Sequence, residues 1–159
     1  LARLSEAVDC ERLLRSSGTF TLKFICPDPH AYALEDETFV ISAEGEHEVL
    51  RTIGTTVSEP VYSIQGVVTS ETDSYISIIT GGEELRVSGA LAEGETLIVD
   101  SSLVTAKVVD SVGNTLRNGL PLLYELNFPI LETGSNTVVV ATSNATFTEL
   151  NIQANSRWR

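Results

Sequence analysis

After residue 34, the chain is a succession of short segments in which apolar and polar residues alternate. A period of two is typical of β-strands that bury one face. Valine, isoleucine and threonine are abundant in these segments, and all three favour a pleated, half-buried surface. The predicted strands are 38–43, 46–53, 60–68, 75–79, 84–88, 95–100, 104–110, 123–127, 137–142 and 145–155.

Turn residues separate these segments. Gly81-Gly82 suits a tight hairpin with positive φ, and Ser101-Ser102 and 111–114 suit further turns. The one helical signal in this part is a single turn near 120–123. No repeat of fixed period is present, which argues against a propeller or solenoid. The sequence therefore predicts an all-β fold, either a β-sandwich or a jelly roll.

The first 33 residues have a different pattern. Apolar residues at helical spacing predict a short amphipathic helix over 6–15, which Ser16-Ser17-Gly18 ends. Residues 20–26 alternate apolar and polar side chains, which predicts a strand with one buried face, and Pro27-Asp28-Pro29 stops it. The apolar positions of the predicted helix are Ala7, Cys10, Leu13 and Leu14.

One helix and one strand cannot bury a core by themselves. The chain begins with Leu1 and contains no methionine, so we expect it to be a fragment of a longer protein. Residues 1–33 are then the remnant of an N-terminal domain, ordered only if they pair with a missing segment or another chain. Residues 34–159 are expected to be an intact β-sandwich.

The charge distribution supports the same division. The formal net charge is -12, yet residues 1–33 hold four bases and four acids and are neutral. Residues 34–159 carry the whole excess of acids. A strongly acidic chain is repelled by nucleic acid and by anionic membranes, so we expect neither as a partner. No apolar run approaches the ~18–20 residues of a transmembrane helix, and no signal peptide is visible.

Candidate chemistry is sparse. His30 lies in a proline turn and His47 lies between two glutamates, and neither has metal-ligand spacing, so we expect solvated side chains. No Gly-x-Ser-x-Gly elbow is present, and nothing points to a base beside Cys10 or Cys26. We expect both cysteines to be buried small hydrophobic residues.

Carboxylates are numerous, so a glycosidase with two facing carboxyl groups is one alternative. The acids are scattered at strand ends and turns, as solubility alone requires. Glu35-Asp36-Glu37 could hold a hard cation, but the spacing of a calcium loop is absent. We therefore predict no enzyme activity, no catalytic residues, no cofactor and no metal. The scattered acids are Glu71, Asp73, Glu83, Glu84, Glu93, Glu95, Asp100 and Asp110.

Carbohydrate binding without catalysis is a second alternative, and it usually requires exposed aromatic side chains. Aromatic residues make up 6% of the chain, and the single tryptophan, Trp158, is next to the last residue. Tyr62, Tyr75 and Tyr124 lie within apolar segments, so we expect them in the core.

Several motifs occur in the order found in distal tail proteins of siphophages, the long-tailed bacteriophages. One stretch resembles the end of their N-terminal domain, where a strand runs into a Cys-Pro-Asp-Pro-aromatic-Ala-Tyr-like motif, and this chain has His30 at the aromatic position. This stretch runs from Ala2-Arg3-Leu4 through Ile25 to Tyr32. The rest of the resemblance is carried by Gly54-Thr55, Glu59-Pro60-Val61, Gly66, Glu95 through Asp100, Asn118-Gly119, Phe128-Pro129-Ile130-Leu131, Gly134, Asn136-Thr137 and Arg157-Trp158.

The resemblance implies a C-terminal galectin-like sandwich over 34–159, preceded by the close of a ring-forming domain over 1–33. It implies a structural, non-enzymatic component of a phage or prophage baseplate, located at the tail tip of the virion and assembled in the bacterial cytoplasm. The implied partners are the tail tube, the tail-associated protein and the receptor-binding protein, with a hexameric ring in the full-length protein. The alternative function is a carbohydrate-binding module that helps adsorption to the host cell wall.

Overall fold

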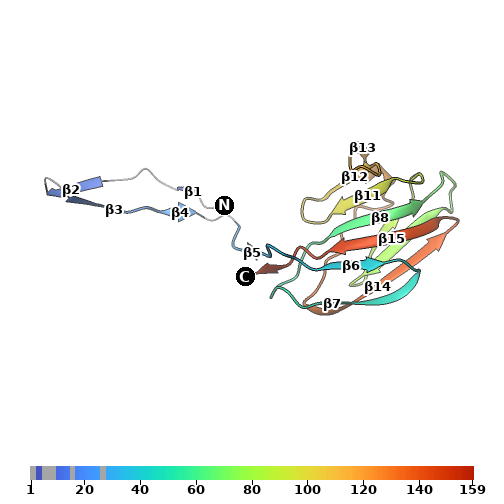
Figure 1. The fold of residues 1–159 in the computed structure, drawn as a ribbon, viewed down its shortest axis with the longest axis horizontal. Helices are drawn as coiled ribbons and strands as arrows, with labels where there is room; N and C mark the ends of the chain where they lie inside the picture. Colours follow the sequence, from blue (N-terminus) through green and yellow to red (C-terminus); the bar gives the residue numbers. More distant parts are fainter. Residues whose placement is uncertain (1–2, 5–9, 15–16, 26–27) are drawn as a thin grey trace. The chain divides into compact units, whose positions relative to one another are not determined.

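The computed structural model describes residues 3–4, 10–14, 17–25 and 28–159. The chain divides into two compact units, Leu1–Ala31 and Tyr32–Arg159, close to the boundary predicted between residues 33 and 34 (Figure 1). The second unit begins within β5 (Ala31–Tyr32) and ends with β16 (Arg157–Trp158). None of the described residues lies in a helix long and apolar enough to cross a membrane.

The first unit contains two antiparallel strand pairs. Strand β1 (Arg3–Leu4) pairs with β4 (Phe24–Ile25), and β2 (Cys10–Leu14) pairs with β3 (Ser17–Phe20). The predicted helix is therefore wrong for Cys10–Leu14, while 6–9 and 15 lie outside the described residues. A helix of this length is marginal in water, whereas β2 finds a pairing partner a few residues further along the chain.

The predicted strand over 20–26 is also corrected. It is split between the end of β3 and β4, and Cys26 lies outside the described residues. Its apolar side is not covered, because Phe20 and Phe24 are each 61% exposed and Leu22 is 43% exposed. Among the residues of this unit whose burial is described, none is buried. So short a segment has too little material to cover its own apolar face.

The second unit is an antiparallel β-sandwich (Figure 1). Its six-stranded sheet has the order β13-β12-β11-β8-β15-β6, and its four-stranded sheet has the order β10-β9-β14-β7. In residues 32–159, all of which the structure describes, the single helical element is the 3₁₀ turn η1 (Leu120–Leu122), as the sequence predicts for this part of the chain. The strands are β6 (Thr38–Ile41), β7 (Gly45–Arg51), β8 (Val61–Val67), β9 (Tyr75–Thr80), β10 (Glu83–Val87), β11 (Thr96–Asp100), β12 (Thr105–Val109), β13 (Thr115–Asn118), β14 (Gly134–Ser143) and β15 (Thr146–Gln153).

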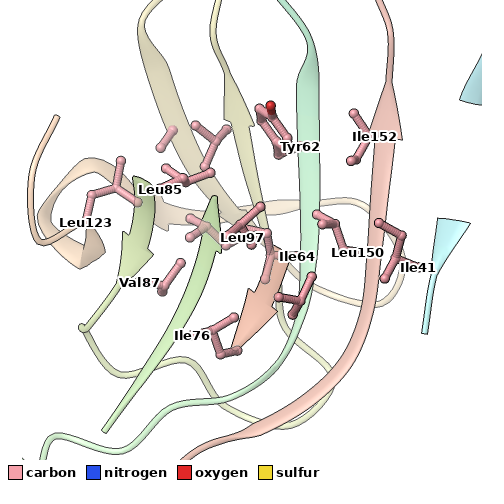
Figure 2. Close-up of a cluster of buried hydrophobic side chains, with 14 of the residues drawn as sticks. Ile41, Tyr62, Ile64, Ile76, Leu85, Val87, Leu97, Leu123, Leu150 and Ile152 are labelled. Carbon is pink, nitrogen blue, oxygen red and sulfur yellow. The ribbon is translucent and has the colours of Figure 1, made fainter. Parts of the chain in front are cut away.

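Alternating residues of both sheets form one core (Figure 2). Tyr62 and Ile64 of β8 are fully buried from one sheet, and Ile76 and Ile78 of β9 are fully buried from the other. In both strands the residues that alternate with these point away from the core. The all-β prediction is confirmed, and the core lies entirely between the two sheets.

Most strand predictions are confirmed within a few residues. The hairpin at Gly81-Gly82 is present, with positive φ at both glycines and Thr80 paired with Glu83. The strand predicted over 123–127 is wrong, because only Leu123 forms a bridge there, to Val87. Strand β13 was not predicted, since all four of its residues are exposed and give no alternating signal.

One turn of the sandwich is strained. Val104, between β11 and β12, has φ 53° and is 55% exposed. A β-branched residue rarely adopts positive φ, and the strain costs about 1–3 kcal/mol. We expect Val104→Gly to stabilise the protein by about 1 kcal/mol after the entropic cost of glycine, measured by urea unfolding. Val112→Gly, a matched change at an exposed valine without positive φ, should give no gain; equal gains in both variants would contradict the strain argument.

Candidate functional site

The outer face of the four-stranded sheet carries a group of polar and aromatic side chains. Leu85 and Val87 of β10 face the core, so Glu84 and Arg86 face outward. The register places Arg86 directly opposite Ser77 of β9. Alternation thus gathers side chains from two adjacent strands on one solvent-facing surface.

Tyr124 joins this surface from a distant part of the chain. The segment after η1 lies along β10, where Leu123 bridges Val87 and the Tyr124 N–H donates to the Arg86 carbonyl at 2.9 Å. Gly89 allows this approach, because a Cβ there would lie 2.7 Å from the Cα of Leu122. The close contact at the end of β10 therefore positions Tyr124 beside Arg86.

The Arg86 guanidinium lies between two tyrosine rings. Its central carbon is 3.8 Å from the centroid of the Tyr75 ring and 5.0 Å from that of Tyr124. These are cation–π distances, and they hold the planar group in place. Its Nε is buried without a hydrogen-bond partner, and no described residue accepts a hydrogen bond from the guanidinium. Tyr124 is 63% exposed.

A hydrogen-bonded pair completes the group. The Ser77 hydroxyl donates to Oε1 of Glu84 at 2.5 Å, while Oε2 of Glu84 accepts no hydrogen bond from the described residues. The site thus offers guanidinium donors, a carboxylate acceptor and an exposed aromatic ring. We call Tyr75, Ser77, Glu84, Arg86 and Tyr124 the Arg86 cluster.

A hollow of about 350 Å³ lies further along the same sheet face. Ile79 of β9 and Val139 of β14 are opposite each other in the register and line it, together with Ser135 and Thr137. Ile79 follows Ser77 on the outward side of β9. The cluster and the hollow therefore share one face of the sheet.

A larger hollow of about 600 Å³ lies beside the six-stranded sheet and contains carboxylates. Hydrogen bonds from Arg117 lower the pKa of Glu95, and hydrogen bonds from Asn114 lower the pKa of Asp110. A glycosidase needs one carboxylic acid with a raised pKa. The shifts of Glu95 and Asp110 are in the opposite direction, and their cause is hydrogen bonding within the fold.

The two histidines do not join a reactive group. The His47 ring is hydrogen-bonded through Nε2 to the Ala43 carbonyl at 2.9 Å, and strand alternation places Glu46 and Glu48 on the opposite face of β7. The His30 ring is 3.0 Å from Oδ1 of Asp28 in the first unit. The carboxylates on either side of His47 in the sequence therefore do not flank its ring.

Two side chains of the acidic run at 35–37 accept hydrogen bonds from backbone N–H groups. Asp36 accepts the N–H of Ser156 at 2.8 Å, and Glu37 accepts the N–H groups of Thr52 and Ile53. Burial acts to raise the pKa of Glu37, but hydrogen bonds from the Thr52 side chain and from the backbone of Ile53 and Thr52 lower it below 4.5. Among the described residues, no group of acids, histidines or cysteines could hold a metal ion.

The lowered pKa of Glu37 predicts acid sensitivity. A carboxylate with a depressed pKa stabilises the folded state above its unfolded pKa, and this is lost as the pH falls through the folded pKa. Between about pH 6 and pH 3, we expect the urea midpoint of Glu37→Gln to fall less steeply than that of the unmodified protein. Glu71→Gln removes a carboxylate without a partner among the described residues and should leave the slope unchanged; equal slopes in all three proteins would contradict this role.

Sequence reasoning placed one tyrosine correctly and missed the others. Tyr62 is fully buried, as predicted. Tyr124 is exposed and Tyr75 is half-buried, so the prediction that both are core residues is wrong. Apolar and polar residues alternate from Tyr124 through Phe128, so the sequence gives no signal that Tyr124 is exposed. The partner Arg86 is 38 positions away, and no local pattern connects the two.

The chain matches no known protein-family model and no curated protein. Two features stand out: the uncovered apolar side of the first unit, and the Arg86 cluster on the sandwich.

Proposed function

We propose that this chain is a structural, non-enzymatic module of a phage or prophage tail tip. The motif succession from Ile25 through Trp158 suggests the distal tail proteins of siphophages. In this proposal the sandwich is a galectin-like jelly roll, and the first unit is the end of a ring-forming domain. The protein then joins the tail tube to the tail-associated and receptor-binding proteins, and the full-length form makes a hexameric ring. Assembly takes place in the host cytoplasm.

The observation that carries the proposal is the contrast between the two units. The sandwich has its own buried core between two sheets. In the first unit Phe20, Leu22 and Phe24 follow a period of two and are uncovered. Uncovered apolar side chains of this size mark surfaces that bind another protein segment. A self-sufficient domain joined to such a segment suits a component of a larger assembly.

The proposal of a non-enzymatic role is supported by the carboxylates. Glu37, Glu95 and Asp110 each have a lowered pKa caused by hydrogen bonds within the fold. Carboxyl groups that serve as general acids need the opposite shift. These residues therefore stabilise turns and strand ends.

Incorporation into particles tests the proposal. In the producing phage, Phe20→Ser combined with Phe24→Ser should lower the amount of this chain in purified virions by about tenfold or more. The reason is the loss of two aromatic contacts that the proposal expects with a neighbouring protein in the particle. Leu103→Ser combined with Val112→Ser removes two exposed apolar side chains from turns of the sandwich and is the matched control. Quantitative mass spectrometry of the particles gives the readout. Unchanged incorporation of the Phe20 and Phe24 variant would contradict the proposal.

A further inference from the structure

We propose that the Arg86 cluster is a binding site for a neutral saccharide. This inference does not depend on the tail-tip role, since it uses only the outer face of the four-stranded sheet. The Arg86 guanidinium is fixed between two rings, its Nε is buried, and its terminal N–H groups have no acceptor among the described residues.

The groups of the cluster match the chemistry of a pyranose ring. A sugar has an apolar C–H face and a rim of hydroxyl groups that both donate and accept hydrogen bonds. The exposed Tyr124 ring offers a surface for the apolar face. The terminal N–H groups of Arg86 supply donors in a fixed plane, and Oε2 of Glu84 supplies an acceptor. An aromatic surface with a few convergent polar groups is the usual composition of a small-ligand site.

The charges at the cluster disfavour anionic ligands and metal cations. The chain has a net charge of -12, Glu84 belongs to the cluster, and Glu83 and Glu125 are neighbours of its members in sequence. These carboxylates repel anionic sugars, phosphates and nucleic acid. The central guanidinium repels a metal cation in turn. A neutral ligand is repelled neither by the carboxylates nor by the guanidinium. If it can both donate and accept hydrogen bonds, it can bind to both groups.

The face of the sheet has room for more than one sugar ring. From Tyr75 to Ile79 the outward side of β9 runs for about 13 Å and reaches the hollow lined by Ile79 and Val139. Ser135 and Thr137 add hydroxyl groups at that end. An oligosaccharide that follows β9 would therefore contact both features, and affinity should rise with chain length.

The test uses the full chain labelled with ¹⁵N. The probes are glucose, maltotetraose and the tetramer of N-acetylglucosamine as neutral sugars, and tetragalacturonate as an anionic one, each at up to about 10 mM. We expect at least one neutral tetrasaccharide to shift the Arg86 Nε–H signal and the amides of Ser77 and Tyr124. Glucose should bind more weakly, and tetragalacturonate should give no saturable shift.

Variants assign the binding to the cluster. Tyr124→Ala should weaken the neutral tetrasaccharide by about tenfold or more, because the stacking surface is lost. Arg86→Lys keeps the charge but loses the planar donors, and should also weaken binding. Leu126→Ala, an exposed residue in the same segment, is the control that should leave binding unchanged. The inference is overturned if no neutral sugar binds, if Tyr124→Ala and Arg86→Lys bind normally, or if tetragalacturonate binds more tightly. None of these results changes virion incorporation, so the two proposals can fail separately.

Discussion

Gly66→Ala is expected to destabilise the sandwich by about 3 kcal/mol, near the upper end of the cost of overpacking. Gly66 lies in β8, the strand between β11 and β15, and its position faces the core. A Cβ there would collide with the carbonyl oxygen of Thr146 and would lie 2.8 Å from Cδ1 of Ile76. The backbone oxygen cannot move aside as a flexible side chain can.

The strand register explains why there is no room for a Cβ atom at Gly66. Strand β15 has a bulge between Phe147 and Glu149, opposite Gly66 and Gln65. A bulge adds one residue to a strand and bends the strand locally. Here the backbone of β15 lies close to β8, and the absence of a side chain at Gly66 makes room for it. Urea unfolding followed by circular dichroism measures the effect, with Gln65→Ala as the control at a neighbouring exposed position. A Gly66→Ala variant within about 0.5 kcal/mol of the unmodified protein would show that the bulge does not exclude a side chain.

Arg51→Ala is expected to cost about 3–4 kcal/mol. Arg51 ends β7 on the core side and is 1% exposed. Its guanidinium donates to the carbonyl oxygens of Leu131 and Thr56, which ties two loops to the end of the strand. Burial lowers the pKa of Arg51, and the nearby carboxylates of Asp36, Glu37 and Glu132 act in the opposite direction. Removal leaves the Thr56 carbonyl without a donor among the described residues, takes the second donor from the Leu131 carbonyl, which still accepts the N–H of Ser58 at 2.9 Å, and opens a cavity.

A second substitution separates these causes. Arg51→Met keeps most of the volume but supplies no donor, so we expect a loss of about 2 kcal/mol from the unsatisfied Thr56 carbonyl and the lost second hydrogen bond to Leu131. The matched control is Arg117→Ala, which removes an exposed arginine paired with Glu95 and should cost less than about 1 kcal/mol. If Arg51→Ala cost no more than Arg117→Ala in urea unfolding, the buried hydrogen bonds would not be holding the loops.

Local sequence patterns were sufficient to predict most strands of the sandwich. The alternation in 75–79 and 84–88, with Gly81-Gly82 between them, predicted the β9–β10 hairpin because hairpins depend on neighbours in sequence. The pairing of β7 with β14 was not predictable from such signals, since residues such as Val49 and Asn136 lie far apart in sequence. The helix predicted at the start failed at Cys10–Leu14 because cross-strand pairing outweighed a weak helical spacing.

The candidate site was the least predictable part. Tyr124 lies in an apolar segment and looked like a core residue, yet its place is set by one bridge between Leu123 and Val87 and by the space above Gly89. Arg86 gave no signal of its own, because a single arginine in a strand is ordinary. Only the packing of η1 against the end of β10 brings these side chains together.

The tail-tip proposal is tested most directly by locating the protein on particles. Antibodies raised against residues 32–159, coupled to gold and applied to virions induced from the source strain, show by electron microscopy where the chain lies. The proposal predicts label concentrated at the distal end of the tail. Label confined to the capsid or to the host cell wall would contradict it.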